Sequence, residues 1–346
     1  MGEVDIMETP EITTYGANID DFHVLSRKYQ RLKEELHNVF WKHSIKTDPE
    51  LSSIPEETRL SLRDKTFEYK ISSFLGNGQF GSVYRAERVG ILYAVKNIDK
   101  KKIRTYEQLS RLAREISIVK SIDHPNIIVL HNVINTPESL LIFFSLGDCD
   151  IFDLQGNNIL PPKSLHIMTE QLIEAVAYLD RNNIAHRDIK PENIICSNKD
   201  ELISGKIDAS LDKTYIKLVD FGLAVKYSNL PFIVGTSYKL RDFCGSPGFF
   251  APEILYKKGY NNKVDWWSTG CVILEFAIKN VKFSKEWMPL YTPVNIKSHS
   301  VFLKNMCNTL PKIKKIVNED ALHDTYLANI IENTLLIEPE RRSLYH

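Results

Sequence analysis

The sequence predicts an α+β protein in which a small β-rich lobe precedes a larger, mainly helical lobe. Two observations support this prediction. Between residues 67 and 146 most apolar residues occur in short alternating runs rich in β-branched and aromatic side chains, as in strands. After residue 147 longer helical stretches dominate, over 163–181, 263–278 and 327–336. Strands early and helices late in one chain favour two unlike packed lobes.

Composition excludes several classes of protein. The chain has 346 residues, 43% of them hydrophobic and 25% charged, as in ordinary globular proteins. Lys plus Arg and Asp plus Glu number 44 each, so no charge excess points to nucleic acid or a membrane surface as a partner. No apolar run approaches the ~18 residues of a membrane span, and no signal peptide is visible. We expect a cytoplasmic protein, with the nucleus also open.

The cysteines give no sign of a structural site. All five lie at least 27 residues apart, and no C-x-x-C pair occurs. An odd number at this spacing argues against a zinc site or a disulfide framework and fits a reducing compartment.

Residues 1–67 form an N-terminal extension of different character. We expect a disordered start, an amphipathic helix over about 18–44 and then a linker. The helix is predicted because apolar residues recur in steps of three and four, at Phe22, Leu25, Tyr29, Leu32, Leu36 and Val39. This helix either packs on its own protein or contacts a partner, and the pattern leaves both open.

The remaining elements are predicted in chain order over residues 68–346, with a small lobe over 68–146 and a large lobe over 147–346. Strands are expected over 67–74, 82–88, 90–96, 127–133, 140–146 and 216–219. Helices are expected over 107–122, 163–181, 263–278 and 327–336.

A glycine-rich motif lies between the first two strands. It has the form G-x-G-x-x-G-x-V and contains Gly76, Gly78 and Gly81. Glycine allows the backbone to approach phosphate oxygens closely. The position between two strands, rather than between a strand and a helix, disfavours a dinucleotide-binding fold. Lys96 ends a following strand and can neutralise phosphate charge, with Glu115 as the carboxylate that fixes its position.

A second group of motifs supplies acidic and amide oxygens. Residues 186–193 have the form H-R-D-x-x-x-x-N, which presents Asp188 and Asn193 from one loop. Asp188 would receive a hydroxyl proton, Asn193 would offer an oxygen to Mg²⁺, and Lys190 would place a cation beside a phosphoryl group. Asp220, in D-F-G after an apolar strand, is the expected second magnesium ligand.

In this order, and followed by A-P-E at residues 251–253, the motifs resemble the eukaryotic serine/threonine protein kinases over about residues 68–346. The sequence looks closest to the calcium/calmodulin-dependent and AMP-activated group. The resemblance implies a two-lobed protein-kinase fold. It also implies a non-specific serine/threonine kinase that transfers the γ-phosphoryl group of ATP, with Mg²⁺, to protein substrates.

The resemblance also implies roles for individual residues. Asp188 would be the catalytic base, assisted by Lys190 and Ser246, and Asn193 and Asp220 would hold Mg²⁺. The expected nucleotide-binding residues lie in the glycine loop, the ion pair and the hinge: Leu75, Gly76, Asn77, Gly78, Gln79, Phe80, Gly81, Ser82, Val83, Lys96, Glu115, Phe144 and Leu146.

Other implied positions support the fold and the cavity. Asp265 would anchor the catalytic loop, and Glu253 and Arg342 would form a buried ion pair whose one-sided loss is strongly destabilising. Phe143 falls where the family has its gatekeeper.

The chain departs from the family pattern between Asn193 and Asp220, which are separated by 26 residues. We expect the surplus, about residues 197–214, to form a polar surface hairpin or loop. It is either a solvated insertion or a docking surface.

Charged residues suggest how activity and specificity are set. Asp242 falls where relatives carry an activating phosphothreonine, so it could supply a permanent negative charge to Arg187. The alternative phosphorylation sites are Thr236, Ser237 and Tyr238. Asp150 and Glu192 suggest a preference for basic substrate sequences.

The same motifs argue against two other functions. A catalytically silent scaffold on the same fold should lack Lys96, Asp188 or Asp220, and none is lost. A small-molecule kinase should lack A-P-E and the pairing of Lys190 with Ser246. An active protein kinase is therefore the favoured interpretation.

Overall fold

The computed structural model describes residues 69–78, 81–136, 138–208, 213–226, 240, 242–255, 259–319, 324–342 and 344. The predicted N-terminal helix and its linker lie outside the described residues, as do Gln79, Phe80 and the alternative phosphorylation sites.

The first lobe is built on an antiparallel five-stranded sheet with the strand order β1–β2–β3–β5–β4. Its strands are β1 (Lys70–Gly78), β2 (Gly81–Arg88), β3 (Ile91–Asp99), β4 (Leu130–Asn135) and β5 (Ser139–Ser145). One apolar cluster of this lobe contains Tyr69, Tyr93, Val95, Leu141 and Phe143, all less than a tenth exposed. Aromatic and β-branched side chains of this kind pack well on a pleated surface.

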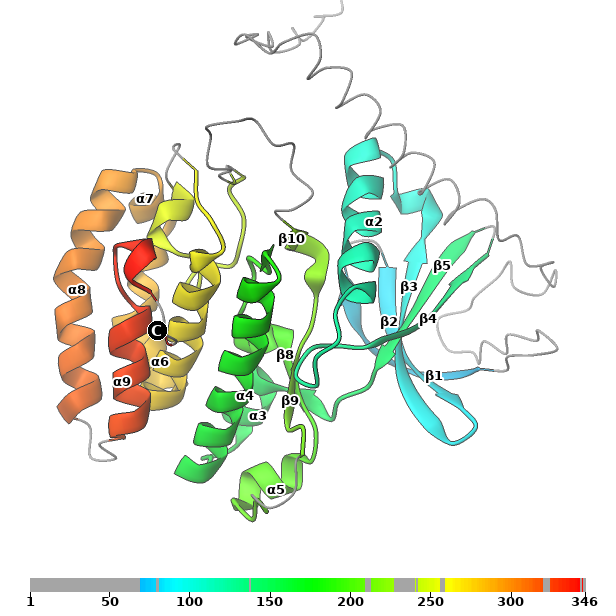
Figure 1. The fold of residues 1–346 in the computed structure, drawn as a ribbon, viewed down its shortest axis with the longest axis horizontal. Coiled ribbons are helices and arrows are strands. Elements are labelled where there is room, and N and C mark those ends of the chain that lie inside the picture. Colours follow the sequence, from blue (N-terminus) through cyan, green and yellow to red (C-terminus); the bar gives the residue numbers. More distant parts are fainter. Residues whose placement is uncertain are drawn as a thin grey trace, which may run out of the picture. The chain divides into compact units, whose positions relative to one another are not determined.

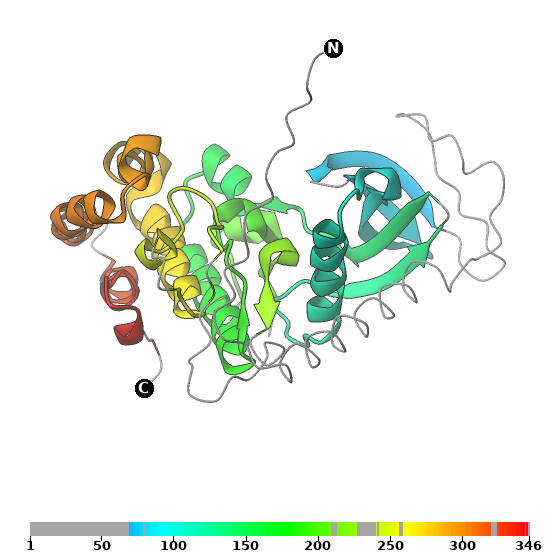
Figure 2. The same cartoon turned by 90° about the horizontal axis from the view of Figure 1, so that it is seen from above.

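Helix α2 (Tyr106–Lys120) lies alongside this sheet, as Figure 1 and Figure 2 both show. It begins with a capping box, in which the Thr105 side chain accepts a hydrogen bond from Gln108 N and the Gln108 side chain accepts one from Thr105 N. Leu112, Ile116 and Val119 are buried, so the helix packs against the rest of the protein through one apolar face.

The second lobe is mainly helical, which confirms the predicted α+β class. Its helices are α3 (Ile151–Asn157), α4 (Pro162–Arg181), α5 (Lys199–Ser204), α6 (Lys263–Glu286), α7 (Pro293–Ile296), α8 (His299–Glu319) and α9 (Thr325–Thr334). Helix α6 is buried almost throughout its first half and contacts α4, α8 and α9. None of the described helices is both long and apolar enough to cross a membrane.

Short strands and 3₁₀ turns position the loops of this lobe. One small sheet has the order β6–β8–β9 and another pairs β10 with β7. These strands are β6 (Cys149–Asp150), β7 (Ile184–Ala185), β8 (Ile194–Cys196), β9 (Ile216–Leu218) and β10 (Val225–Lys226). The 3₁₀ turns are η2 (Lys100–Lys102), η3 (Pro191–Asn193), η4 (Phe221–Leu223), η6 (Pro252–Leu255), η7 (Met288–Tyr291) and η8 (Pro339–Arg341).

Two parts of the predicted outline need correction. Helices α3 and α8 were not predicted; Pro311 inside α8 is a signal against a helix, although Phe302, Met306 and Leu310 recur on its buried face. In addition, α6 continues to Glu286 past Lys279, whose φ of 67° interrupts the helical backbone.

The insertion over residues 197–214 is also not simply a loop. It contains α5, whose Leu202 is fully buried, and Ser164 of α4 donates a hydrogen bond to the Leu202 carbonyl at 2.6 Å. Lys163 of α4 donates to the Ile207 carbonyl at 2.6 Å. The described part of the insertion is therefore bonded to α4 through two backbone carbonyls, and its Leu202 and Ile207 belong to the buried apolar cluster of this lobe.

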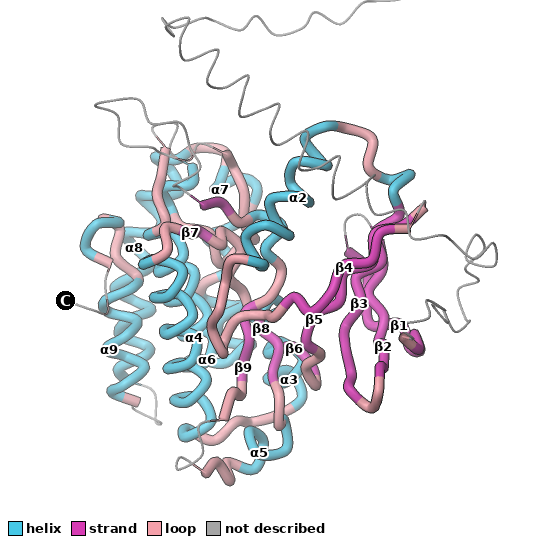
Figure 3. Tube along the Cα trace, turned by 45° about the vertical axis from the view of Figure 1, so that its right-hand side comes forward, coloured by secondary structure: helices cyan, strands magenta, loops and turns pink. Residues whose placement is uncertain are grey.

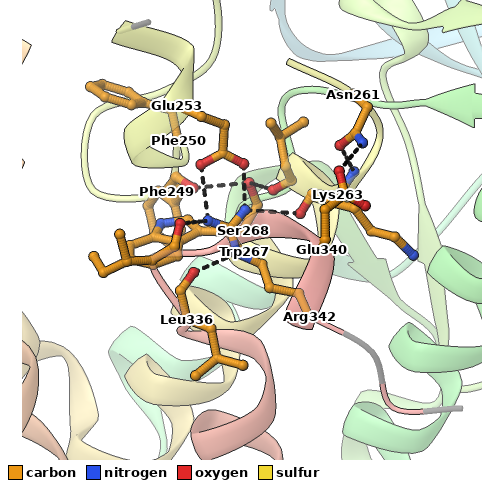
Figure 4. Close-up of polar contacts among 12 residues, drawn as sticks. Phe249, Phe250, Glu253, Asn261, Lys263, Trp267, Ser268, Leu336, Glu340 and Arg342 are labelled. Atoms are coloured by element: carbon orange, nitrogen blue, oxygen red, sulfur yellow. Dashed lines mark hydrogen bonds and ion pairs between the residues drawn. The ribbon is translucent and has the colours of Figure 1, made fainter. Parts of the chain in front are cut away.

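A buried ion pair connects η6 to the residue that follows η8. The Arg342 guanidinium contacts both carboxylate oxygens of Glu253, with Nη2 2.9 Å from Oε2 (Figure 4). Arg342 also donates to the Leu336 carbonyl at 2.7 Å and lies 5.0 Å from the centre of the Trp267 ring. Every polar edge of this fully buried cation thus faces an acceptor or an aromatic ring, as a buried charge requires.

We predict that Arg342→Ala lowers the free energy of unfolding by about 3–5 kcal/mol, because it leaves the Glu253 carboxylate buried and unpaired. Chemical denaturation would measure this change. The matched control is Lys315→Ala, which removes an ion pair to Glu319 whose two side chains are at least 65% exposed. We expect the control to change stability by less than about 1 kcal/mol. Equal effects of the two substitutions would contradict the role of the buried pair.

Candidate active site

A cavity of about 620 Å³ contains most of the predicted site residues. It is lined by β1, β2, β3, α2, the segment after β5, and the loops around β8 and β9. Of the predicted residues, these line it: Leu75, Gly76, Asn77, Gly78, Val83, Lys96, Glu115, Phe144, Leu146, Asp188, Asn193 and Asp220. Lys190 and Ser246 lie beside this set and are bonded to Asp188.

An ion pair joins the sheet to α2 inside the cavity. Lys96 Nζ lies 2.6 Å from Glu115 Oε1, and the side chains are 17% and 8% exposed. Burial alone lowers the pKa of Lys96, but the charges of Glu115 and Asp220 outweigh it and leave this pKa above its ordinary value. Lys96 is therefore a fixed, permanent cation whose position depends on α2.

The described residues of the glycine motif end β1 and begin β2, and these antiparallel strands pair at the edge of the cavity. Gly78 pairs with Gly81, and Ser82 donates a hydrogen bond to the Asn77 side chain at 3.0 Å. A Cβ on Gly81 would lie 1.7 Å from the Asn97 carbonyl oxygen, so no side chain fits there. Gly81 is needed for close packing on β3, while Gly76 has open space around it.

The prediction that Phe143 takes the gatekeeper position beside the cavity is wrong. Side chains alternate between the two faces of a strand, and Phe143 is fully buried in the apolar cluster of the sheet, 4.1 Å from the Tyr69 ring centre. Its neighbour Phe144, paired with Ala94 of β3, lines the cavity. Phe143 and Phe144 are neighbours in β5, so their side chains lie on opposite faces of the sheet.

A buried carboxylate holds the loop that follows β7. Asp265, in the first turn of α6 and 2% exposed, accepts hydrogen bonds from His186 N at 2.6 Å and from Arg187 N at 2.8 Å. Burial raises the pKa of Asp265, and these hydrogen bonds and neighbouring charges oppose that rise. Arg187 has a φ of 70°, a strained backbone conformation for a residue other than glycine. The two hydrogen bonds hold the loop in this conformation.

Asp188 lies at the centre of a compact network of hydrogen bonds. Ser246 Oγ donates to Asp188 Oδ1 at 2.8 Å and accepts from Lys190 Nζ at 2.8 Å. Lys190 Nζ lies 3.5 Å from Asp188 Oδ2, and Asn193 Nδ2 donates to that oxygen at 3.0 Å. The carboxylate is fixed on both sides, yet it still lines the cavity.

The donor atoms near Asp188 suit a hard divalent cation. The Nδ2 group of Asn193 makes the hydrogen bonds to Asp188, which leaves its amide oxygen available for a cation. Asp220 follows β9 with a φ of 61° and presents a carboxylate to the same cavity. Within the described part of the chain no group of three or more acidic, His or Cys side chains forms a complete metal site. One carboxylate and one amide fit Mg²⁺, which retains water and phosphate ligands.

A cluster around Arg187 links this loop to the segment before A-P-E. The buried Arg187 guanidinium donates to Tyr260 OH at 3.1 Å and to Asp242 Oδ2 at 3.3 Å, and its Nε donates to the Leu223 carbonyl at 2.7 Å. Burial and the charge of Arg187 lower the pKa of Arg114 on α2, while the Asp242 charge opposes this shift. Tyr260 was missed because no sequence pattern marked it.

Glu275 was also missed. It is 4% exposed in α6, and no described residue hydrogen-bonds to its Oε2. Burial, together with the charge of Glu192, raises the pKa of Glu275 to about 7. An acidic residue inside the otherwise apolar stretch 271–278 was the available signal.

This fold and this arrangement of ion pair, glycine motif and carboxylates match the protein kinase domain family over residues 69–345. The chain belongs to that family, and the predicted resemblance is confirmed.

Several relatives carry the serine/threonine-protein kinase name. The serine/threonine-protein kinase cds1 of Schizosaccharomyces pombe is 30% identical over 295 residues, covering 81% of this chain and 57% of that protein. The carbon catabolite-derepressing protein kinase of Candida glabrata is 29% identical over 282 residues, 80% of this chain and 40% of that protein. CBL-interacting serine/threonine-protein kinase 18 of Arabidopsis thaliana is 31% identical over 232 residues, 66% and 41% of the two chains. This chain thus spans between 40% and 57% of these relatives' lengths.

For the phosphoryl transfer that we propose for this chain, we predict that Asp265→Asn lowers kcat by about 10- to 100-fold and changes the KM for ATP by less than about threefold. The amide cannot accept both backbone hydrogen bonds, so the loop carrying Asp188 moves while β1–β3 and Lys96 stay in place. Steady-state kinetics would measure the effects on kcat and on KM separately. An unchanged kcat in a folded variant would show that the two hydrogen bonds do not position the loop.

Proposed function

We propose that this chain is an active serine/threonine protein kinase that transfers the γ-phosphoryl group of ATP, with Mg²⁺, to hydroxyls of protein substrates. The observation that carries the proposal is the fixed Asp188 carboxylate, bonded to Ser246 and Asn193 in the same cavity as the Lys96–Glu115 pair. A silent scaffold would have no need to hold all of these charges in place.

Each residue has a distinct part in the proposed reaction. Lys96, held by Glu115, binds phosphate oxygens, and the glycine motif lets the backbone approach them. Asp188 accepts the proton of the attacking hydroxyl, while Lys190 offsets charge that develops on the phosphoryl oxygens. Mg²⁺, held by Asn193 and Asp220, would supply the remaining positive charge. The chemistry needs positioning and electrostatic stabilisation more than covalent participation.

The adenine end of the nucleotide would lie against the hinge. Phe144 and Leu146 line the cavity there. Leu75 and Val83 cover the cavity from the sheet side. These contacts are apolar, as is usual for the part of a pocket that takes a flat ring.

Serine or threonine is the proposed acceptor because of the Lys190–Ser246 hydrogen bond at 2.8 Å. By family resemblance, this pairing belongs to serine/threonine kinases rather than tyrosine kinases.

The test of the proposal is a radiolabel assay on a generic basic protein with Mg-ATP. We expect Asp188→Ala to reduce the rate by at least about 100-fold, because general base catalysis and loop geometry are both lost. Thermal unfolding of the variant would control for folding. Equal incorporation by the two proteins would contradict the proposed role of Asp188.

We further propose that the acidic residues near the cavity favour basic substrate sequences. Asp150 and Glu192 line the cavity, and Glu275 lies close enough to Glu192 to be affected by its charge. Glu275 Oε2 is buried without a hydrogen-bond partner among the described residues, which is costly to the fold. We propose that a basic side chain of the substrate compensates this cost.

This proposal predicts a pH dependence. Because the pKa of Glu275 is raised to about 7, the carboxyl is largely protonated at about pH 6 and largely charged at about pH 8. The preference in kcat/KM for a basic peptide over its alanine counterpart should therefore increase severalfold between these pH values. We expect Glu275→Gln to remove the increase.

The same substitution should raise stability. A raised carboxyl pKa in the folded state means that folding loses stability as pH rises through that pKa. Glu275→Gln should thus increase the unfolding temperature by a few degrees at about pH 8. A variant that is less stable and keeps the peptide preference would contradict the proposal.

Asp242 is proposed to supply the negative charge that Arg187 needs, without phosphorylation. Their ion pair measures 3.3 Å, with Arg187 4% and Asp242 73% exposed. An exposed partner contributes little stability, so we expect Asp242→Ala to lower kcat by about two- to tenfold rather than unfold the protein. Asp242→Glu is the charge-preserving control and should retain most activity. Loss of wild-type activity on phosphatase treatment, or full activity of Asp242→Ala, would contradict this hypothesis.

A further inference from the structure

Two cysteines that are 47 positions apart in the sequence face each other across a pair of strands. Cys149 in β6 is directly opposite Cys196 in β8, and these strands lie side by side in Figure 3. Their Sγ atoms are 3.4 Å apart, and both thiols are free. Opposed residues of antiparallel strands have Cα atoms ~4.5–5.5 Å apart, within the ~4.4–6.8 Å that a disulfide spans. A bond between them therefore needs little backbone movement.

The two thiols differ in how a reagent can reach them. Cys149 is half-buried and lines the cavity, whereas Cys196 is fully buried. A small reagent that enters the cavity meets Cys149 first, and Cys196 is then the only described thiol in contact with it. The pair thus has an accessible attacking thiol and a shielded resolving thiol.

We propose that Cys149 and Cys196 form a reversible intramolecular disulfide when the protein encounters a low-molecular-weight disulfide. The Cys149 thiolate attacks one sulfur of the reagent, whose sulfur–sulfur bond breaks, and one small thiol leaves with a proton from solution. The Cys196 thiolate then attacks Cys149 Sγ and releases the second small thiol in the same way. Two protein thiols are oxidised and one small disulfide is reduced to two thiols.

The surroundings make this reaction slow at neutral pH. Burial raises the pKa of Cys149, and the acidic groups of Asp148 and Asp150 raise it further, while its contact with Cys196 opposes the shift. Burial also raises the pKa of Cys196 to about 12. Since the thiolate is the reactive form, the rate should increase as pH rises.

The bond would connect two functional parts of the cavity. Cys149 directly precedes Asp150, which caps α3, and β8 begins directly after Asn193. A cross-link here fastens the cavity rim to the strand that leaves the catalytic loop. The proposal depends only on the two thiols and stands independently of the proposed kinase activity.

The experiment treats the full-length reduced protein with glutathione disulfide at about pH 7 and about pH 8.5, followed by alkylation and non-reducing peptide mapping. We expect a Cys149–Cys196 cross-link, lighter than the dithiol by two hydrogen atoms, that forms faster at the higher pH and is reversed by dithiothreitol. The exposed Cys307 should instead carry a glutathione adduct.

Two variants separate the steps. Cys196→Ser removes the resolving thiol, so Cys149 should retain a glutathione adduct, whereas Cys307→Ser should form the cross-link as the wild type does. The proposal is overturned if Cys149 and Cys196 stay reduced while Cys307 reacts. It is equally overturned if wild-type Cys149 keeps its glutathione adduct without closing on Cys196.

Discussion

The arrangement of the candidate active site depends on one buried carboxylate, Asp265. It accepts two backbone N–H groups from a loop whose Arg187 has a left-handed backbone conformation. A strained backbone persists only where its surroundings determine it, and α6, packed among three other helices, supplies that rigidity. Because Asp265 fixes this loop, it also fixes the position of Asp188 and the start of β8. It likewise sets the contacts of Arg187 with Leu223 and Asp242. The polar site is thus held by a helix that is buried almost throughout its first half.

Much of the fold could be predicted from the sequence because its physical causes are local. Alternating residues predicted the first three strands of the sheet, and two short apolar runs predicted β4 and β5. Apolar residues spaced at three and four predicted α2, and helical stretches were also predicted near α4, α6 and α9. The candidate site could be predicted for a similar reason. Short motifs place Asp188 and Asn193 on one loop, and the bond of Asn193 to Asp188 follows from that spacing. The family resemblance then indicated which distant motifs meet.

The remaining features depend on contacts between distant residues, which no local pattern contains. Phe143 was assigned to the cavity because position in a motif does not fix the face of a strand, and a shift of one residue reverses it. The sequence over 197–214 looks polar, yet Leu202 and Ile207 are buried, and their carbonyls accept hydrogen bonds from Ser164 and Lys163 of α4. The cysteine spacing concealed the contact of Cys149 with Cys196, because strand pairing and not sequence separation brings them together. Tyr260 likewise joins the Arg187 cluster only through the fold.

In the proposed reaction these contacts select serine or threonine as the acceptor residue. Lys190 and Ser246 meet over the Asp188 carboxylate, in the same cavity as the Lys96–Glu115 pair. The most direct test is phosphoamino-acid analysis of a mixed protein substrate after reaction with γ-labelled ATP and Mg²⁺. We expect the label in phosphoserine and phosphothreonine, with none in phosphotyrosine. Label in phosphotyrosine, or no transfer by a folded protein, would contradict the proposed function.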